Sequence, residues 1–306
     1  MKTILAVDST SGILSVSLSE GSNILSEIKD DKSMKHMINI ISDIDQVLKM
    51  AGKTIKEIDL FAVNLGPGDF TGGRIGISVV KMLSMLSGSP VLGFNSLDVF
   101  SVGCMLKNIS DVSKNISGFS QQYIMPLMDV RNNEIYCGIY EACTSLNNTT
   151  IFSFDFEDKK YFLNKISDGF LLNNSDFSEK IIHIINQVNL LDRGSSISFD
   201  HLSEGNNYDE ELTQEKVQNN QNESEQKKHS YIITANSLKT YGEILKNIKK
   251  EVSVNYMETE IIFDDKNINP SSEYINYLAD YSYSFSLKSL PMSPVYVRDF
   301  IAFGKK

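Results

Sequence analysis

The chain has a deficit of basic residues and few cysteines. Its 306 residues include 29 Lys and Arg against 39 Asp and Glu, which gives a formal net charge of −10. Such a chain lacks the general basic surface that holds a nucleic-acid backbone, so any RNA contact must be local or supplied by a partner. The three cysteines form no CxxC pair and no zinc-like cluster. This cysteine usage favours a reducing compartment over a disulfide framework.

The sequence also has no segment typical of secretion or membrane insertion. Asp8 interrupts the apolar stretch at the N-terminus, and no apolar run approaches the roughly 18 residues that a membrane-spanning helix needs. We therefore expect a cytoplasmic protein with no membrane contact. Hydrophobic residues make up 41% of the chain, enough for one large core or two modest ones.

Motifs of self-sufficient catalysis are missing. The four histidines form no HExxH or HxxxH pair, and no GxSxG elbow occurs. The nucleotide-binding patterns GxxxxGK[ST] and GxGxxG are absent as well. These absences disfavour a metal-dependent hydrolase, including a metallopeptidase.

The first hundred residues alternate between strand and helix patterns. Apolar periodicity predicts strands at 3–7, 13–18, 60–65 and 90–93, an amphipathic helix over 33–52 and a second helix that follows the loop 66–73 and ends near Gly88. This order predicts an α/β lobe with a mostly parallel sheet and a leading hairpin.

A second beginning follows this lobe. A strand at 123–128 ends at Asp129, and a strand at 134–141 comes after a short turn, as at Asp8. The repeat predicts a duplicated lobe, with residues 1–107 in the first copy and 108–306 in the second.

Helices are expected at 178–188, 238–249 and 271–287, the last of which we expect to pack back on the first lobe. The polar segment 202–228 reads as a mobile surface insertion or, less favoured, a partner-binding arm.

Asp8, Ser9 and Thr10 are candidates for a nucleotide site. A carboxylate at a strand end, beside hydroxyls and turn amides, can hold phosphate oxygens or a hydrated magnesium ion. In a duplicated fold Asp129 would face Asp8 across a cleft, with the nucleotide between them. The alternative is a hairpin turn that Asp and Ser side chains stabilise.

The loop 66–74 leads into a helix with one side nearly bare of bulk. Gly72 and Gly76 lie one turn apart, followed by Val80 and next to Ile77. Small residues at this spacing let another backbone approach closely. That backbone can belong to the chain's own sheet or to a second subunit.

Four segments in order along the chain resemble the TsaB family, also called YeaZ. The GPGxFTGxRIGxS pattern is the most specific of them and is shared with the catalytic relatives of the family. The matching segments are LAVDST at 5–10, LGPGDFTGGRIGIS at 65–78, MDVR with EIY at 128–131 and 134–136, and PVYVR at 294–298.

The resemblance implies an actin-like and Hsp70-like ATPase fold built from two ribonuclease H-like lobes. It also implies a non-catalytic, cytosolic subunit of the machinery that makes N6-threonylcarbamoyladenosine next to the tRNA anticodon. The implied partners are TsaD, which binds the metal and transfers the threonylcarbamoyl group, and the ATPase TsaE. ATP and magnesium then belong to the partners, the Asp8 site is a vestige that could bind a nucleotide weakly, and tRNA is reached only through the complex.

The resemblance also implies an interface on the first lobe. Family members pair through their first two helices, with TsaD or, in its absence, with a second copy. The residues that this assigns to the interface here are Met37, Ile41, Ile44, Gly72, Arg74, Gly76, Ile77 and Val80.

Three residues depart from the family pattern. Asp69 replaces a usual serine, Gly73 a bulky aliphatic residue, and Met34 a frequent histidine. A carboxylate at Asp69 disfavours a phosphate nearby. The alternative function, of a different class, is a free-standing ATPase or kinase of the same fold that uses Asp8 and Asp129 around magnesium.

Overall fold

The computed structural model describes residues 1–30, 36–118, 121–130, 134–173, 175, 177–191, 229–235, 238–255, 259–264, 270–285 and 292–293. The expected insertion at 202–228 and the motif at 294–298 lie outside these residues. The elements in chain order are β1 (Thr3–Asp8), β2 (Leu14–Glu20), β3 (Asn23–Asp30), α1 (His36–Met50), η1 (Ile55–Glu57), β4 (Leu60–Asn64), α2 (Phe70–Ser87), β5 (Val91–Phe94), α3 (Ser96–Lys107), α4 (Ile109–Gly118), β6 (Gln121–Asp129), β7 (Glu134–Cys137), β8 (Tyr140–Cys143), β9 (Thr150–Phe156), β10 (Lys159–Lys165), β11 (Phe170–Asn173), α5 (Phe177–Leu191), β12 (His229–Ala235), α7 (Leu238–Asn255), β13 (Thr259–Phe263) and α8 (Ser272–Ser284).

The two sheets have the same plan. The first has the order β3-β2-β1-β4-β5, in which β4 and β5 run parallel to β1 while β2 is antiparallel to it. In the second, β12 and β13 are parallel on one side of β6, and β7 and β8 are antiparallel on the other. The predicted duplication and the fold class of two ribonuclease H-like lobes are therefore confirmed.

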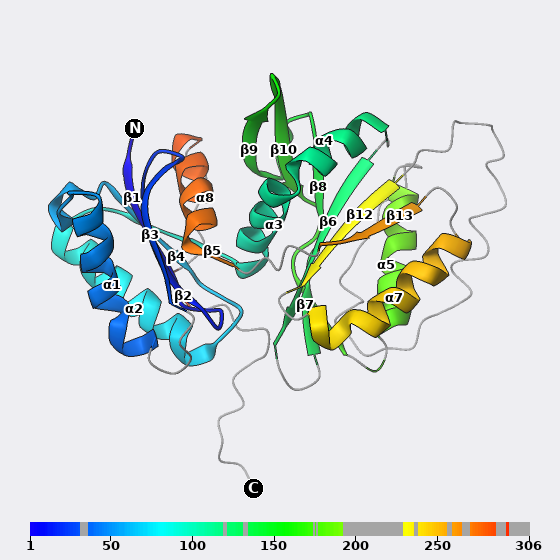
Figure 1. Ribbon diagram of the computed structural model, residues 1–306, viewed down its shortest axis with the longest axis horizontal. Helices are drawn as coiled ribbons and strands as arrows, with labels where there is room; N and C mark the ends of the chain where they lie inside the picture. The colour runs from blue at the N-terminus through cyan, green and yellow to red at the C-terminus, as the bar shows by residue number, and fades with distance from the viewer. Residues whose placement is uncertain are drawn as a thin grey trace, which may run out of the picture.

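Five layers stack across the molecule. Helices α1 and α2 cover the outer face of the first sheet, and α5 and α7 cover the outer face of the second (Figure 1). The layer between the sheets contains α3, α4 and α8 (Figure 1). Within it two helices are exchanged, because α3 follows β5 but packs on β6, whereas α8 follows β13 but packs on β1 and β2.

This exchange gives the two lobes a shared core. Alternate residues of β1 point to opposite faces, so Leu5 and Val7 meet the outer helices while Ile4 and Ala6 face the middle layer. The middle cluster also contains Met128 from β6 and the side chains of α3 and α8. Because one set of buried side chains belongs to both sheets, the lobes are packed as one unit.

Two elements differ from expectation for physical reasons. The strand expected at 134–141 is two strands, β7 and β8, with an interruption at Gly138 and Ile139 opposite Pro126, which has no N–H to donate to the ladder. The helix α3 has no amphipathic pattern to predict it. Nine of its residues are buried, on every side of the helix.

None of the described helices combines the length and the apolar composition required to cross a membrane.

Candidate functional site

The Asp8 carboxylate lies at the end of β1 and has no exposed surface. Its Oδ1 accepts hydrogen bonds from the backbone N and the hydroxyl of Thr10, each at 2.8 Å, and its Oδ2 accepts one from the Asn64 side-chain amide at 3.0 Å. Burial raises the pKa of Asp8, and these hydrogen bonds oppose the rise. Both carboxylate oxygens thus have partners within the chain.

The loop 66–73 lies directly on the turn after Asp8. The backbone N of Asp69 donates to the carbonyl of Thr10 at 2.6 Å, and the Ser9 hydroxyl donates to the carbonyl of Gly72 at 2.8 Å. A Cβ at Gly68 would lie 2.2 Å from the Thr10 carbonyl oxygen, and one at Gly72 would lie 2.1 Å from that of Ser9. These two glycines are required for the close approach of the loop to the turn.

Ser96, the first residue of α3, extends this cluster. Its hydroxyl lies 2.7 Å from the Pro67 carbonyl and 2.9 Å from Asn64 Oδ1, while its backbone N donates to the Gly66 carbonyl at 2.9 Å. Asn64 Oδ1 also accepts from the backbone N of Gly66 at 3.0 Å. The turn, the loop and the start of α3 therefore form one hydrogen-bonded unit.

This geometry favours the alternative of a stabilised hairpin turn at the predicted nucleotide site. Asp8 and Thr10 are 0% and 2% exposed, and Ser9 is partly buried with its hydroxyl bonded to the loop. The groups that were expected to meet a phosphate or a magnesium ion hold the chain's own turn and loop in this structure, and weak nucleotide binding there stays a prediction. Asp129 lies at the end of β6, partly exposed, and its placement opposite Asp8 across a cleft stays a prediction.

The small-residue side of α2 is likewise an internal contact. Gly72 and Gly76 pack on the turn after β1, where a Cβ at Gly76 would lie 2.2 Å from the Ser9 hydroxyl oxygen. Ile44, Ile77 and Val80 belong to the core between α1, α2 and the first sheet. In this structure the backbone that approaches the glycines belongs to the same chain, and an interface role for these five residues stays a prediction.

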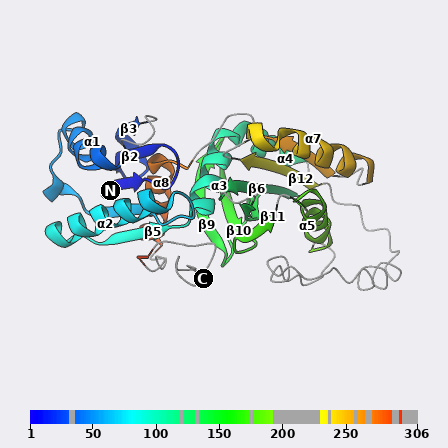
Figure 2. The same ribbon diagram turned by 90° about the horizontal axis from the view of Figure 1, so that it is seen from below.

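The opposite side of the two outer helices is exposed and apolar. Helix α2 presents Met82, Met85 and Leu86 to solvent, with exposures of 48%, 84% and 76%, and α1 presents Ile41 at 50%. We call these four residues the apolar face. The helices α1 and α2 lie side by side on the side of the first sheet that is remote from the second lobe (Figure 2). The side chain of Met37 lies outside the described residues.

The start of α2 is well defined. The Asp69 side chain caps the helix by accepting a hydrogen bond from the backbone N of Gly72 at 2.7 Å. The exposed Arg74 guanidinium lies 3.8 Å from the centre of the Phe70 ring, in a cation–π contact one turn into the helix. Asp69 therefore has a structural role as the N-cap of α2, a role that the serine usual in the family pattern could also fill.

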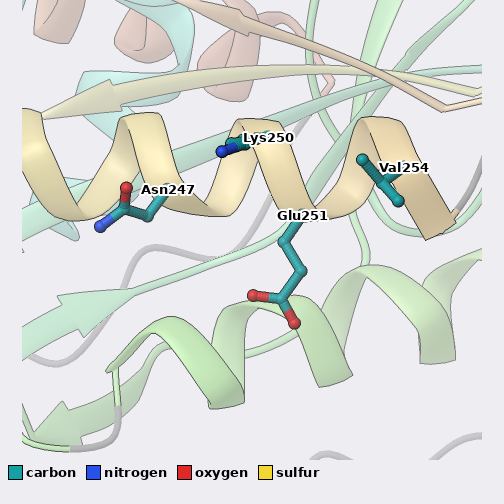
Figure 3. A pocket seen from close by; sticks show the side chains of 4 residues that line it. All are labelled: Asn247, Lys250, Glu251 and Val254. Carbon is teal, nitrogen blue, oxygen red and sulfur yellow. The ribbon is translucent and has the colours of Figure 1, made fainter.

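Two other surface features carry no site. The stripe of Asn247, Lys250, Glu251 and Val254 follows one face of α7 and forms a shallow depression (Figure 3). A second depression lies between the N-terminus and the end of α8, lined by Met1, Lys2, Gly21, Ser22, Asp280, Tyr283 and Ser284. Among the described residues, no group of three or more His, Cys, Asp and Glu side chains is arranged to hold a metal ion.

Neither Asn64 nor Ser96 was predicted as a site residue. Asn64 is the last residue of β4, and Ser96 lies shortly after the end of β5, both at the same edge of the first sheet as Asp8. Because the carboxyl ends of parallel strands meet at one edge, polar residues at the ends of the strands predicted at 60–65 and 90–93 were the available signal.

Comparison with known proteins gives a consistent assignment. A family model described as TsaD, tRNA N6-adenosine threonylcarbamoyltransferase, matches residues 24–151. The tRNA threonylcarbamoyladenosine biosynthesis protein TsaB of Buchnera aphidicola subsp. Schizaphis graminum is 26% identical over 165 residues, which are 54% of this chain and 71% of that protein. The TsaB protein of Bacillus subtilis is 23% identical over 139 residues, 45% of this chain and 55% of that protein.

The fold comparison covers nearly the whole chain. The structure of YeaZ from Pseudomonas aeruginosa superimposes with a TM-score of 0.56 at 16% identity, over 97% of this chain and all of that one. At this identity the likeness concerns the fold, which agrees with the duplicated lobes described above. The GPGDFTGGRIGIS segment lies within the matched family region. The sequence and fold comparisons together support a relationship of this chain to the TsaB/YeaZ family.

Proposed function

We propose that this protein is a non-catalytic subunit of the machinery that makes N6-threonylcarbamoyladenosine in tRNA. In this role it pairs with the catalytic subunit TsaD, helps to recruit the ATPase TsaE, and contacts tRNA only through the assembled complex. The names of its TsaB relatives and the TsaD family match support the pathway. The net charge of −10 supports a partner-supplied tRNA surface.

The apolar face is the observation that supports a pairing role. Met82, Met85 and Leu86 lie within two turns of α2 and are largely exposed. A cluster of exposed aliphatic side chains on two adjacent helices is typical of a protein–protein interface. Two residues predicted for the interface are exposed on these helices, Ile41 of the apolar face and Arg74 of α2, and both stay candidates for the contact.

The alternative of a free-standing ATPase or kinase receives no support from the Asp8 hairpin. A catalytic or metal-binding carboxylate must reach its ligand, and Asp8 is fully buried with both oxygens bonded to Thr10 and Asn64. The role in a complex is therefore the function that the geometry favours.

Sedimentation of mixtures with TsaD and TsaE from the same organism tests this function. We expect the wild type to form a complex with TsaD, and Met85→Glu to weaken it at least tenfold because a charge replaces an exposed apolar contact. Val254→Glu on α7 is the matched control, since Val254 is also an exposed aliphatic residue, at 72%, on the other lobe. Equal binding by all three proteins would contradict the proposed interface.

A further inference from the structure

The buried cluster around Asp8 connects helix α2 with the layer between the two lobes. On one side, it holds the loop that leads into α2, which carries most of the apolar face. On the other side, it includes Ser96, which begins α3 of the layer between the lobes. The question is what this cluster does for the protein if it does not hold a nucleotide.

Hydrogen bonds attach the loop 66–73 to the turn after Asp8. Asp69 and Gly72, which begin α2, are bonded to Thr10 and Ser9. The Thr10 amide and hydroxyl are themselves fixed by the Asp8 carboxylate. The start of α2 is thus attached to a turn whose conformation depends on a buried carboxylate.

Ser96 connects the same loop to the second lobe. Ser96 holds the carbonyls of Gly66 and Pro67, and the helix that it begins packs on β6. Any displacement of α3 with the second sheet must move this end of the loop or break these buried hydrogen bonds. A broken bond would leave buried polar atoms without partners, which is costly.

We infer that Asp8, Thr10, Asn64 and Ser96 form a positioning cluster that fixes the start of α2, and with it the apolar face, relative to helix α3 between the lobes. The cluster takes the place at the hairpin that a nucleotide was expected to fill, and it sets the geometry of the partner surface from within. These are positioning residues, since none of them lies on the apolar face. The inference rests on the proposed function of that face.

The test combines hydrogen–deuterium exchange of the free chain with measurement of its affinity for TsaD. Ser96→Ala and Thr10→Val each remove a hydroxyl from the cluster, while Thr10→Ser retains it and Ser253→Ala removes an exposed hydroxyl from α7. We expect the first pair to speed exchange at the Gly72 and Gly73 amides roughly tenfold and to weaken TsaD binding roughly threefold or more. The second pair should match the wild type in both measurements.

Three results would overturn the inference. Unchanged exchange in residues 66–73 would show that the cluster does not hold the loop, and faster exchange spread evenly over the chain would show a general loss of stability. Faster local exchange with unchanged affinity would separate the cluster from the partner surface. Failure of the proposed function is recognised separately, because Met85→Glu would then also leave TsaD binding unchanged.

Discussion

Asp8 is the residue whose ionisation most directly reports on the buried hairpin. Burial raises its pKa above the ordinary 3.8, so over the window between 3.8 and the raised value the native state retains a proton that the unfolded chain has released. Wild-type stability should therefore fall as pH rises through this window, and Asp8→Asn should lack that loss. Urea unfolding at a series of pH values measures this effect. The free energy of unfolding of Asp8→Asn should approach that of the wild type as the pH rises. Parallel plots of unfolding free energy against pH for the wild type and Asp8→Asn would contradict a raised pKa of Asp8.

Gly76 tests the internal assignment of the small-residue side of α2. Its added Cβ would meet the Ser9 hydroxyl oxygen at 2.2 Å, so Gly76→Ala should cost about 2 kcal/mol of unfolding free energy. The cost should fall when Ser9→Ala removes the clashing atom. Gly12→Ala is the control, since nothing lies within 4 Å of its added Cβ. A Gly76→Ala protein of unchanged stability that fails only to pair would restore the intermolecular interpretation.

Replacing two helical glycines by alanine should change the free energy of unfolding in opposite directions. Gly103 of α3 lies under the Tyr274 ring of α8, where an added Cβ would be 2.5 Å from the ring, so Gly103→Ala should destabilise the protein by about 2 kcal/mol. Gly242 of α7 has nothing within 4 Å, so Gly242→Ala should stabilise it by roughly 0.5–1 kcal/mol through helix propensity. Denaturant unfolding measures both. Equal changes in unfolding free energy for Gly103→Ala and Gly242→Ala would contradict the close packing of α3 on α8.

Elements with a regular apolar period could be predicted from the sequence, and those buried on all sides could not. Strands β1, β2, β4 and β5, helix α1 and the paired hairpins that indicate duplication have clear patterns, whereas β3 was not predicted. Helix α3 has none, and β2 alternates Leu and Val with Ser15 and Ser17, which look solvent-facing. In the structure α8 covers these serines: Ser15 accepts from the backbone N of Ser272, and Ser17 from the Asn276 amide.

The candidate site could be predicted only in part, for a related reason. Glycine spacing in α2 shows that a backbone must approach closely, but it does not show whether that backbone is internal or belongs to a partner. The short distances from Gly72 and Gly76 to Ser9 decide this question. The exposed apolar face is then found only after the buried side of each helix is known.

The exchange of α3 and α8 between the lobes predicts that the whole molecule unfolds cooperatively. The middle core contains Ile4 of the first sheet, Met128 of the second and Leu278 of α8, so neither sheet can keep its inner face buried alone. Calorimetry should show one transition, with equal calorimetric and van't Hoff enthalpies. Two separated transitions would contradict a shared core and would indicate that the lobes unfold independently.

Threonylcarbamoyl transfer to tRNA by TsaD, with TsaE and the threonylcarbamoyl adenylate supplied, tests directly whether this protein acts as a required subunit. The reaction is measured without this protein, with the wild type, and with Met85→Glu or its control Val254→Glu. We expect transfer with the wild type and the control, and at least tenfold less transfer with Met85→Glu or without the protein. Equal transfer by TsaD alone, or full activity of Met85→Glu, would contradict a subunit that acts through the apolar face of α1 and α2.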